Sequence, residues 1–267
     1  MKRVENGIPV LAYHDIEIGF RLGSLNPSAA QFESQVRFLK EKGYRSVSLD
    51  EVVRDGGEGR AVALTFDDGY EGVHRYALPV LVKYGFTGTV FVVTGFVGRR
   101  SLWDLNLRWL GGRHMDWSAV RDLARAGLTI GSHTVTHPDL VHLDDRRVRG
   151  ELVDSKRRLE DALGAPVDRL SYPFGRYDAR VKDAATAAGY RLACTIRPRR
   201  GEDGRDPLAL KRLCIRSLDR LSDFRGKVRE GGPTRFQDCK EAVLAACNRS
   251  SLIARRRYDR REDEGET

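Results

Sequence analysis

Short apolar runs alternate with amphipathic helical patterns along most of this chain. Three runs, Ile8 to Tyr13, Ala61 to Phe66 and Thr87 to Val93, have the length of buried strands, and the last is rich in Thr, Val and Phe. Shorter strands are predicted over residues 129–131, 169–172, 191–195 and 213–215.

The intervals between these strands carry helical patterns. A first helix is predicted to begin with Asn26 as N-cap and Pro27 at its first position, and to end at Gly43. Ser48 to Glu51 forms a capping-box pattern that opens a short helix. The longest amphipathic pattern runs from Asp144 to Leu163. Further helices are predicted over residues 77–84, 117–126, 178–188 and 222–229.

Repeated alternation of strand and helix predicts parallel strands in an α/β fold. About seven such units suit one barrel better than two separate domains. No linker-like stretch divides the chain before residues 231–233, Gly-Gly-Pro. We therefore expect a barrel over residues 1–230. Residues 231–267 are then expected to form an accessory helix, over 235–258, and a charged, disordered tail.

Polar or conformationally special residues follow four of the predicted strands. These residues are His14, the pair Asp67-Asp68, His133, and the pair Pro173-Phe174. In a parallel barrel the residues just past the carboxyl ends of the strands meet at one mouth, where active sites lie. The sequence therefore predicts that these four segments converge.

The Asp67-Asp68 pair and the imidazoles of His133 and His137 suit a metal site. One carboxylate and two imidazoles hold a divalent metal with coordination positions left open, and the second carboxylate can act as a base. The alternatives are an ordinary Asp-Gly turn and surface imidazoles. Pro138 disfavours a helical conformation at His137, so we expect a structured loop rather than the helical zinc-protease motif.

Three segments resemble the motifs of the polysaccharide deacetylases, the family also called NodB-like or carbohydrate esterase family four. These segments are Thr65-Phe66-Asp67-Asp68-Gly69, Ser132 to His137, and Ser171-Tyr172-Pro173-Phe174-Gly175. The resemblance covers roughly residues 8 to 230 and implies a single-domain, distorted (β/α)7 barrel. It also implies Asp68, His133 and His137 as ligands of one divalent metal, often zinc. Asp67 is implied as the general base, and the backbone amide of Phe174 as an oxyanion donor.

The chain departs from the family pattern at two places. The third motif of many members begins with an Arg that orients the base, and Ser171 stands there instead; Arg176 is our candidate substitute. Many members also carry a late motif whose His acts as the general acid. This motif is absent here, because no His follows His142. The segment Leu11 to Asp15 resembles the N-terminal motif of the permuted poly-N-acetylglucosamine deacetylases, which makes His14 the candidate acid. A structural His at the mouth is the alternative.

The leading hypothesis is a metal-dependent amidohydrolase that removes N-acetyl groups from an amino sugar or polysaccharide. Pro173, Phe174 and Trp103 are candidate substrate contacts, Trp103 by stacking on a sugar ring or, alternatively, as a core residue. The alternatives are a cytoplasmic small-molecule amide or ureide hydrolase and a catalytically silent carbohydrate-binding protein. We treat His74, His114 and His142 as surface or packing residues.

Bulk properties change this interpretation little. The net charge of +9, from 47 basic and 38 acidic residues, is spread along the chain, so we expect no nucleic-acid partner. There is no run of 18 apolar residues and no secretory leader pattern. We therefore expect no membrane span and a cytoplasmic location, or an extracytoplasmic one if the chain is a trimmed form. The four Cys residues are expected to be buried, reduced thiols.

Overall fold

The computed structural model describes residues 7–19, 26–54, 60–100, 112–196 and 206–230. The strands are β1 (Val10–Tyr13), β2 (Arg45–Ser46), β3 (Ala61–Phe66), β4 (Thr89–Val92), β5 (Thr129–Ser132), β6 (Arg169–Ser171), β7 (Leu192–Thr195), β8 (Leu210–Lys211) and β9 (Leu213–Cys214). The α-helices are α1 (Ala29–Glu41), α2 (Leu49–Arg54), α3 (Leu78–Tyr84), α4 (Trp117–Arg125), α5 (Asp145–Leu163), α6 (Ala179–Ala187) and α7 (Leu221–Glu230). Short helical turns, η1 to η4, span Val73–Ala77, Thr94–Phe96, Leu140–His142 and Pro173–Gly175.

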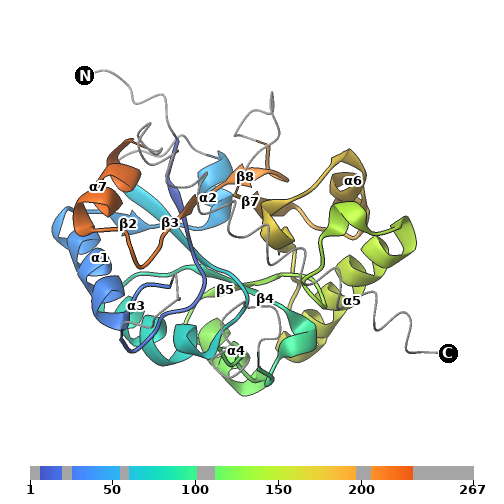
Figure 1. The fold of residues 1–267 in the computed structure, drawn as a ribbon, viewed down its shortest axis with the longest axis horizontal. Helices are drawn as coiled ribbons and strands as arrows, with labels where there is room; N and C mark the ends of the chain where they lie inside the picture. The colour runs from blue at the N-terminus through green and yellow to red at the C-terminus, as the bar shows by residue number, and fades with distance from the viewer. Residues whose placement is uncertain (1–6, 20–25, 55–59, 101–111, 197–205, 231–267) are drawn as a thin grey trace.

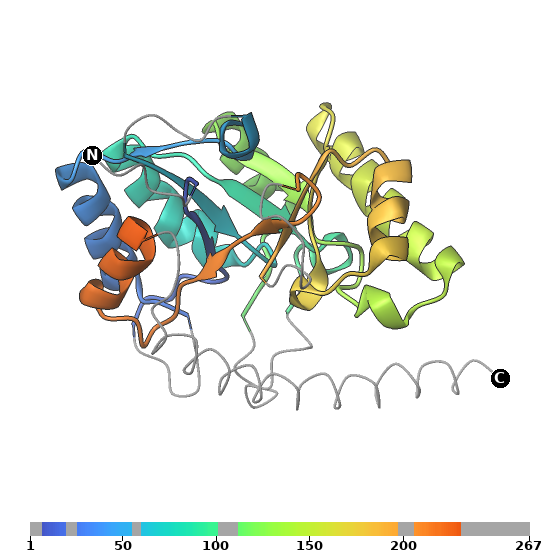
Figure 2. The same cartoon turned by 90° about the horizontal axis from the view of Figure 1, so that it is seen from above.

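The strands pair in parallel and form a ring. The order is β8-β7-β6-β5-β4-β3-β1-β9, with β2 attached to the start of β3. β8 and β9 are two halves of one stretch of chain, interrupted at Arg212: β8 pairs with β7, and β9 pairs with β1. This one segment therefore closes the sheet into the predicted (β/α)7 barrel. Figures 1 and 2 show the helices arranged around the outside of the strands.

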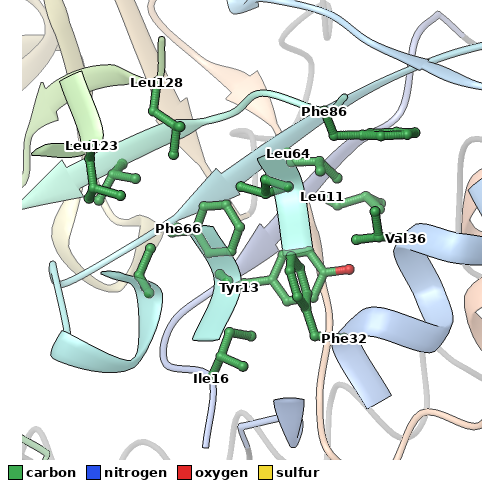
Figure 3. Close-up of a cluster of buried hydrophobic side chains, with 14 of the residues drawn as sticks. Leu11, Tyr13, Ile16, Phe32, Val36, Leu64, Phe66, Phe86, Leu123 and Leu128 are labelled. Atoms are coloured by element: carbon green, nitrogen blue, oxygen red, sulfur yellow. The ribbon is translucent and has the colours of Figure 1, made fainter. Parts of the chain in front are cut away.

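Alternation along the strands separates the core into layers. Every second residue of β3, namely Val62, Leu64 and Phe66, packs outward in the largest cluster with side chains of α1, α3, α4 and α7. Figure 3 shows part of this cluster. The intervening residues Ala61 and Ala63 face inward, in a separate cluster. A third cluster lies between β6, β7 and the helices α5 and α6.

An aromatic group lies where β1, β3 and α1 meet. The ring centroids of Tyr13 and Phe32 are 5.2 Å apart in an edge-to-face arrangement, and those of Tyr13 and Phe66 are 5.4 Å apart and stacked (Figure 3). Both geometries are favourable for aromatic pairs. The Tyr13 hydroxyl is satisfied because it donates to Gln35 Oε1 at 2.9 Å. This packing fixes the end of β1, directly before His14.

The predicted elements are confirmed for the most part, with one correction at the first helix. Its N-cap is Ser28 rather than Asn26, in a complete capping box with Gln31. The Asn26 side chain instead accepts a long bond from the Asp15 N–H at 3.4 Å and donates to Glu17. Asn and Ser are both favourable N-cap residues. Ser28 is preferred here because the side chain of Gln31, three residues later, accepts a second hydrogen bond from the Ser28 N–H.

Two further expectations concern the cysteines and the membrane. Cys194 and Cys214 are buried free thiols, as predicted, and burial raises the pKa of Cys194 to about 12. Cys239 and Cys247 lie outside the described residues, as do the accessory helix and tail expected over 231–267. Within the described ranges, no helix is both long enough and apolar enough to span a bilayer.

Candidate functional site

Asp67 enters the barrel mouth because it continues the inward-facing series of β3. The residues Ala61, Ala63 and Thr65 face the barrel interior, and period-two alternation places Asp67 on the same side. The Asp67 N–H donates to Tyr13 O at 2.9 Å, which extends the β1–β3 pairing by one residue. The carboxylate is almost fully buried, at 2% exposure for the residue. Such a buried charge requires a partner.

That partner is Arg212, at the interruption between β8 and β9. Its guanidinium contacts the carboxylate through two parallel bonds: Nη1 to Oδ1 at 2.7 Å and Nη2 to Oδ2 at 2.6 Å. The same group donates to Thr65 Oγ1 at 3.1 Å and to Ser171 Oγ at 2.9 Å. A bidentate pair of this kind fixes both the position and the rotation of the carboxylate.

The electrostatic surroundings keep Asp67 ionised. Burial alone would raise the pKa of Asp67, but the charge of the Arg212 guanidinium and its hydrogen bonds to the carboxylate outweigh that effect. The pKa of Asp67 is therefore held well below its usual range. An ionised, oriented carboxylate at the mouth is the chemical requirement for a base that accepts a proton from water.

Arg212 is the functional residue that the sequence interpretation missed. The candidate substitute for the third-motif Arg, Arg176, is wrong: it forms an ion pair with Asp139 at 2.6 Å, and the bonds to Asp67 come from Arg212. The Arg that orients the Asp67 carboxylate comes instead from the segment that closes the barrel. The available signal in the sequence was weak: Arg212 stands directly before the strand predicted over residues 213–215, next to another basic residue, Lys211.

The side chains of Asp68, His133 and His137 converge beside Asp67. Asp68 Oδ1 lies 3.5 Å from His133 Nε2 and 3.6 Å from His137 Nε2, and all three residues are buried. These separations exceed a hydrogen bond, but two tetrahedral zinc ligands at ~2.1 Å from a metal are themselves ~3.4 Å apart. Within the described part of the chain, no other group of three potential metal ligands comes together in this way.

The donor set and its burial fit a divalent metal. Ligand atoms of the three residues all lie within 4.8 Å of one another. One carboxylate and two imidazoles give three protein ligands, which leaves positions for water and substrate in a catalytic site. The predicted convergence of these three residues is thereby confirmed by the geometry.

His133 has the protonation state that a metal ligand needs. Its Nδ1 lies 2.7 Å from Ser171 O, and because a carbonyl can only accept, Nδ1 carries the proton. Nε2 then presents its lone pair towards Asp68. Burial lowers the pKa of His133 to about 4, against the opposing effect of the Asp67 charge. The imidazole is therefore neutral at physiological pH.

Backbone strain in the described residues is concentrated at this site. Four non-glycine residues have positive φ: Asp68 (68°), Thr134 (68°), His137 (59°) and Phe174 (59°). Each such conformation costs of order 1–3 kcal/mol and persists only where the surroundings impose it. At Asp68 the left-handed turn redirects the chain after β3, so that two successive carboxylates both reach the mouth instead of opposite faces of the sheet.

His114 supports this turn from behind. Its Nδ1 lies 2.9 Å from the carbonyl oxygen of Asp68, and its ring stacks on Tyr70 with centroids 4.7 Å apart. The expectation of a packing role is therefore met, and the residue packs against the turn at Asp68. His74 lies 3.5 Å from Asp122 and His142 lies 3.6 Å from Asp139, both away from the cluster.

His14 and the third motif complete the mouth. His14 follows β1, is partly buried, and lies near enough to Asp67 and His133 for its charge to affect their pKa values. The ring of Phe174 contacts that of His137, with centroids 4.6 Å apart, and Pro173 is buried. Trp103 lies outside the described residues.

Comparisons with known proteins agree with this geometry. The family model of the polysaccharide deacetylases matches residues 54–193, which include the two Asp residues and both His residues of the cluster but neither His14 nor Arg212. YxkH of Bacillus subtilis is 29% identical over 213 residues, which cover 78% of this chain and 71% of YxkH.

A curated deacetylase and the solved structure of another deacetylase are also similar to this chain. The poly-β-1,6-N-acetyl-D-glucosamine N-deacetylase of Staphylococcus aureus is 34% identical over 161 residues, 55% of this chain, and the match spans only about half (53%) of that protein. The solved structure of the Streptococcus pyogenes deacetylase PplD, in complex with acetate, superposes with a TM-score of 0.72 at 25% identity, covering 83% of this chain and 98% of that one. With a family model over more than half of its length and a barrel that matches a member's, this chain belongs to the polysaccharide deacetylase family.

Proposed function

We propose that this protein is a metal-dependent hydrolase that removes N-acetyl groups from amino-sugar units of a polysaccharide. The observation that carries the proposal is the convergence of Asp68, His133 and His137 beside a carboxylate, Asp67, that Arg212 holds ionised. The staphylococcal relative acts on poly-β-1,6-N-acetyl-D-glucosamine by its name, and this polymer is the first substrate class to test.

In this proposal each residue of the mouth has one task. Asp68, His133 and His137 hold a divalent metal, zinc being the preferred candidate, which supplies Lewis acidity towards the amide carbonyl and lowers the pKa of water. Asp67 accepts the proton of the attacking water. The Phe174 N–H donates to the carbonyl oxygen as negative charge develops there. His14 gives a proton to the nitrogen as the C–N bond breaks, which releases acetate and a free amine.

Released acetate tests this function. Zinc-reconstituted and chelator-treated protein would be incubated with β-1,6-linked N-acetylglucosamine oligomers, with chito-oligomers, and with a cyclic amide such as hydantoin. We expect acetate from a sugar oligomer, loss of the activity on chelation, and recovery with zinc. Hydrolysis of hydantoin without acetate release would favour the small-molecule alternative. Deacetylation that persists without metal would contradict the assigned metal role.

The role of His14 as the acid predicts a dependence on the leaving group. His14→Ala is expected to lower turnover of the amide substrate by ~10²–10⁴-fold, because an amine leaves only after protonation. With 4-nitrophenyl acetate, whose leaving group needs no proton, the turnover of the same variant should fall far less. Bound zinc should match the wild type in both cases. Equal losses on the two substrates would show that His14 is not the acid.

A further inference from the structure

The segment between the two imidazoles of the candidate metal site is held by the helix that follows it. Thr134 and His137 both have positive φ, so the segment from His133 to His137 is not a relaxed loop. Its backbone turns within a few residues, and this turn sets the distance between the two Nε2 atoms. What holds the turn therefore decides whether both imidazoles face Asp68.

Glu151 of α5 makes the contacts at the centre of this segment. Its Oε2 accepts bonds from two successive backbone N–H groups, Val135 at 2.7 Å and Thr136 at 2.9 Å. Its Oε1 accepts from the hydroxyl of Thr136 at 2.6 Å. Both oxygens of one carboxylate are thus bound to the part of the chain that separates the metal-ligand candidates. Bonds to an ionised acceptor are stronger than neutral ones.

Ser155, one turn further along α5, holds the start of the same segment. The hydroxyls of Ser155 and Ser132 lie 2.7 Å apart, both buried, and Ser132 Oγ accepts from the Thr134 N–H at 3.1 Å. Residues four apart lie on one helix face. The face of α5 that carries Glu151 and Ser155 therefore contacts the segment at both its beginning and its middle. Thr134 Oγ1 in turn accepts from the His137 N–H at 3.0 Å.

We propose that Glu151 is a positioning residue for the metal centre: it holds the segment from His133 to His137 in the shape that metal binding requires. The inference rests on the metal centre of the proposed function and names a residue that this centre depends on without contacting the metal. A site whose ligands are already in position loses less conformational entropy on binding, so its affinity is higher. A carboxylate that merely capped a loop would contribute to stability and leave metal affinity unchanged.

The chain offers a matched control on the same helix. Glu160 of α5 also accepts a backbone bond, from the Val167 N–H at 2.9 Å, and forms an ion pair with Lys156. Its contacts lie at the other end of α5, away from the segment that carries His133 and His137. Glu160→Gln therefore removes the same kind of carboxylate contact from the same helix without touching the candidate metal site.

The test is the zinc affinity of metal-stripped protein, measured by competition with a chromophoric chelator, alongside the thermal midpoint. Glu151→Gln should weaken zinc binding by ~10–100-fold, the usual effect of removing an outer-shell partner, whereas Glu160→Gln should bind like the wild type. Thr136→Val, which keeps Glu151 and its two N–H bonds, should show a smaller loss in the same direction and remains informative if Glu151→Gln does not fold.

Unchanged zinc affinity in Glu151→Gln or, if that variant does not fold, in Thr136→Val would overturn the inference, as would an equal loss in Glu160→Gln. If the wild type itself binds no zinc, the proposed metal centre is wrong, and the inference falls with it. Because the wild type is measured first, failure of the proposed function and failure of the positioning role give different results.

Discussion

Replacing Arg212 with Met is expected to lower the free energy of unfolding by about 3–5 kcal/mol. The substitution leaves the buried Asp67 carboxylate without the two guanidinium bonds that compensate its burial. Urea denaturation of the metal-free protein measures the difference. Arg176→Met serves as the control, because the Arg176–Asp139 ion pair has an Arg side chain that is 42% exposed. An exposed pair contributes only ~0–1 kcal/mol.

The cost of Arg212→Met should also depend on pH in a defined direction. In the wild type the pKa of Asp67 is depressed, so its contribution to stability is present above the unfolded-state pKa of ~3.9 and is lost as pH falls through the lower folded value. Without Arg212, burial raises the pKa of Asp67 above the unfolded value, and acidification relieves the penalty. The stability difference should therefore shrink from pH 7 towards pH 4. A small difference, or one that does not change with pH, would contradict the assigned pairing.

Asp67→Asn should retain the metal and lose most of the turnover. The amide fills the same space but cannot accept a proton from water, and removing a general base costs ~10²–10⁴-fold in rate. Acetate release and zinc content would be measured on the same preparation.

Asp68→Asn is the matched comparison one residue away. It should instead lower zinc affinity, because Asp68 Oδ1 is the oxygen that faces both imidazoles. Near-normal turnover in zinc-loaded Asp67→Asn would exclude this residue as the base. An equal decrease of zinc affinity in the two variants would contradict the separate roles assigned here, Asp67 as the base and Asp68 as the ligand.

Local patterns predicted those elements that local physics determines. β3 spans Ala61–Phe66 as expected from an uninterrupted apolar run, and α5 ends before Gly164, whose φ of 66° suits glycine. The first helix was misplaced by two residues at its start, because Asn26 and Ser28 are both good caps. Only the reciprocal bond to Gln31 decides between them.

The features that the sequence did not predict depend on contacts between residues that are far apart along the chain. Arg212 is far from Asp67 along the chain, and they meet only because one short segment pairs with β7 on one side and β1 on the other. Arg176 was the nearer candidate along the chain, but it faces Asp139. The convergence of Asp68, His133 and His137 was predictable because all three follow parallel strands, whose carboxyl ends must meet. Glu151 gave no such signal, since Glu is a common residue in helices and no local pattern marks its contacts with Val135 and Thr136.

The most direct measurement of the central claim is a crystal structure of the protein soaked in zinc, with anomalous scattering recorded at the zinc edge. We expect one strong peak bonded to Asp68, His133 and His137 at ~2.0–2.2 Å, with the Asp67 carboxylate still paired to Arg212. A peak bonded to other residues, or none at this cluster in zinc-saturated crystals, would contradict it.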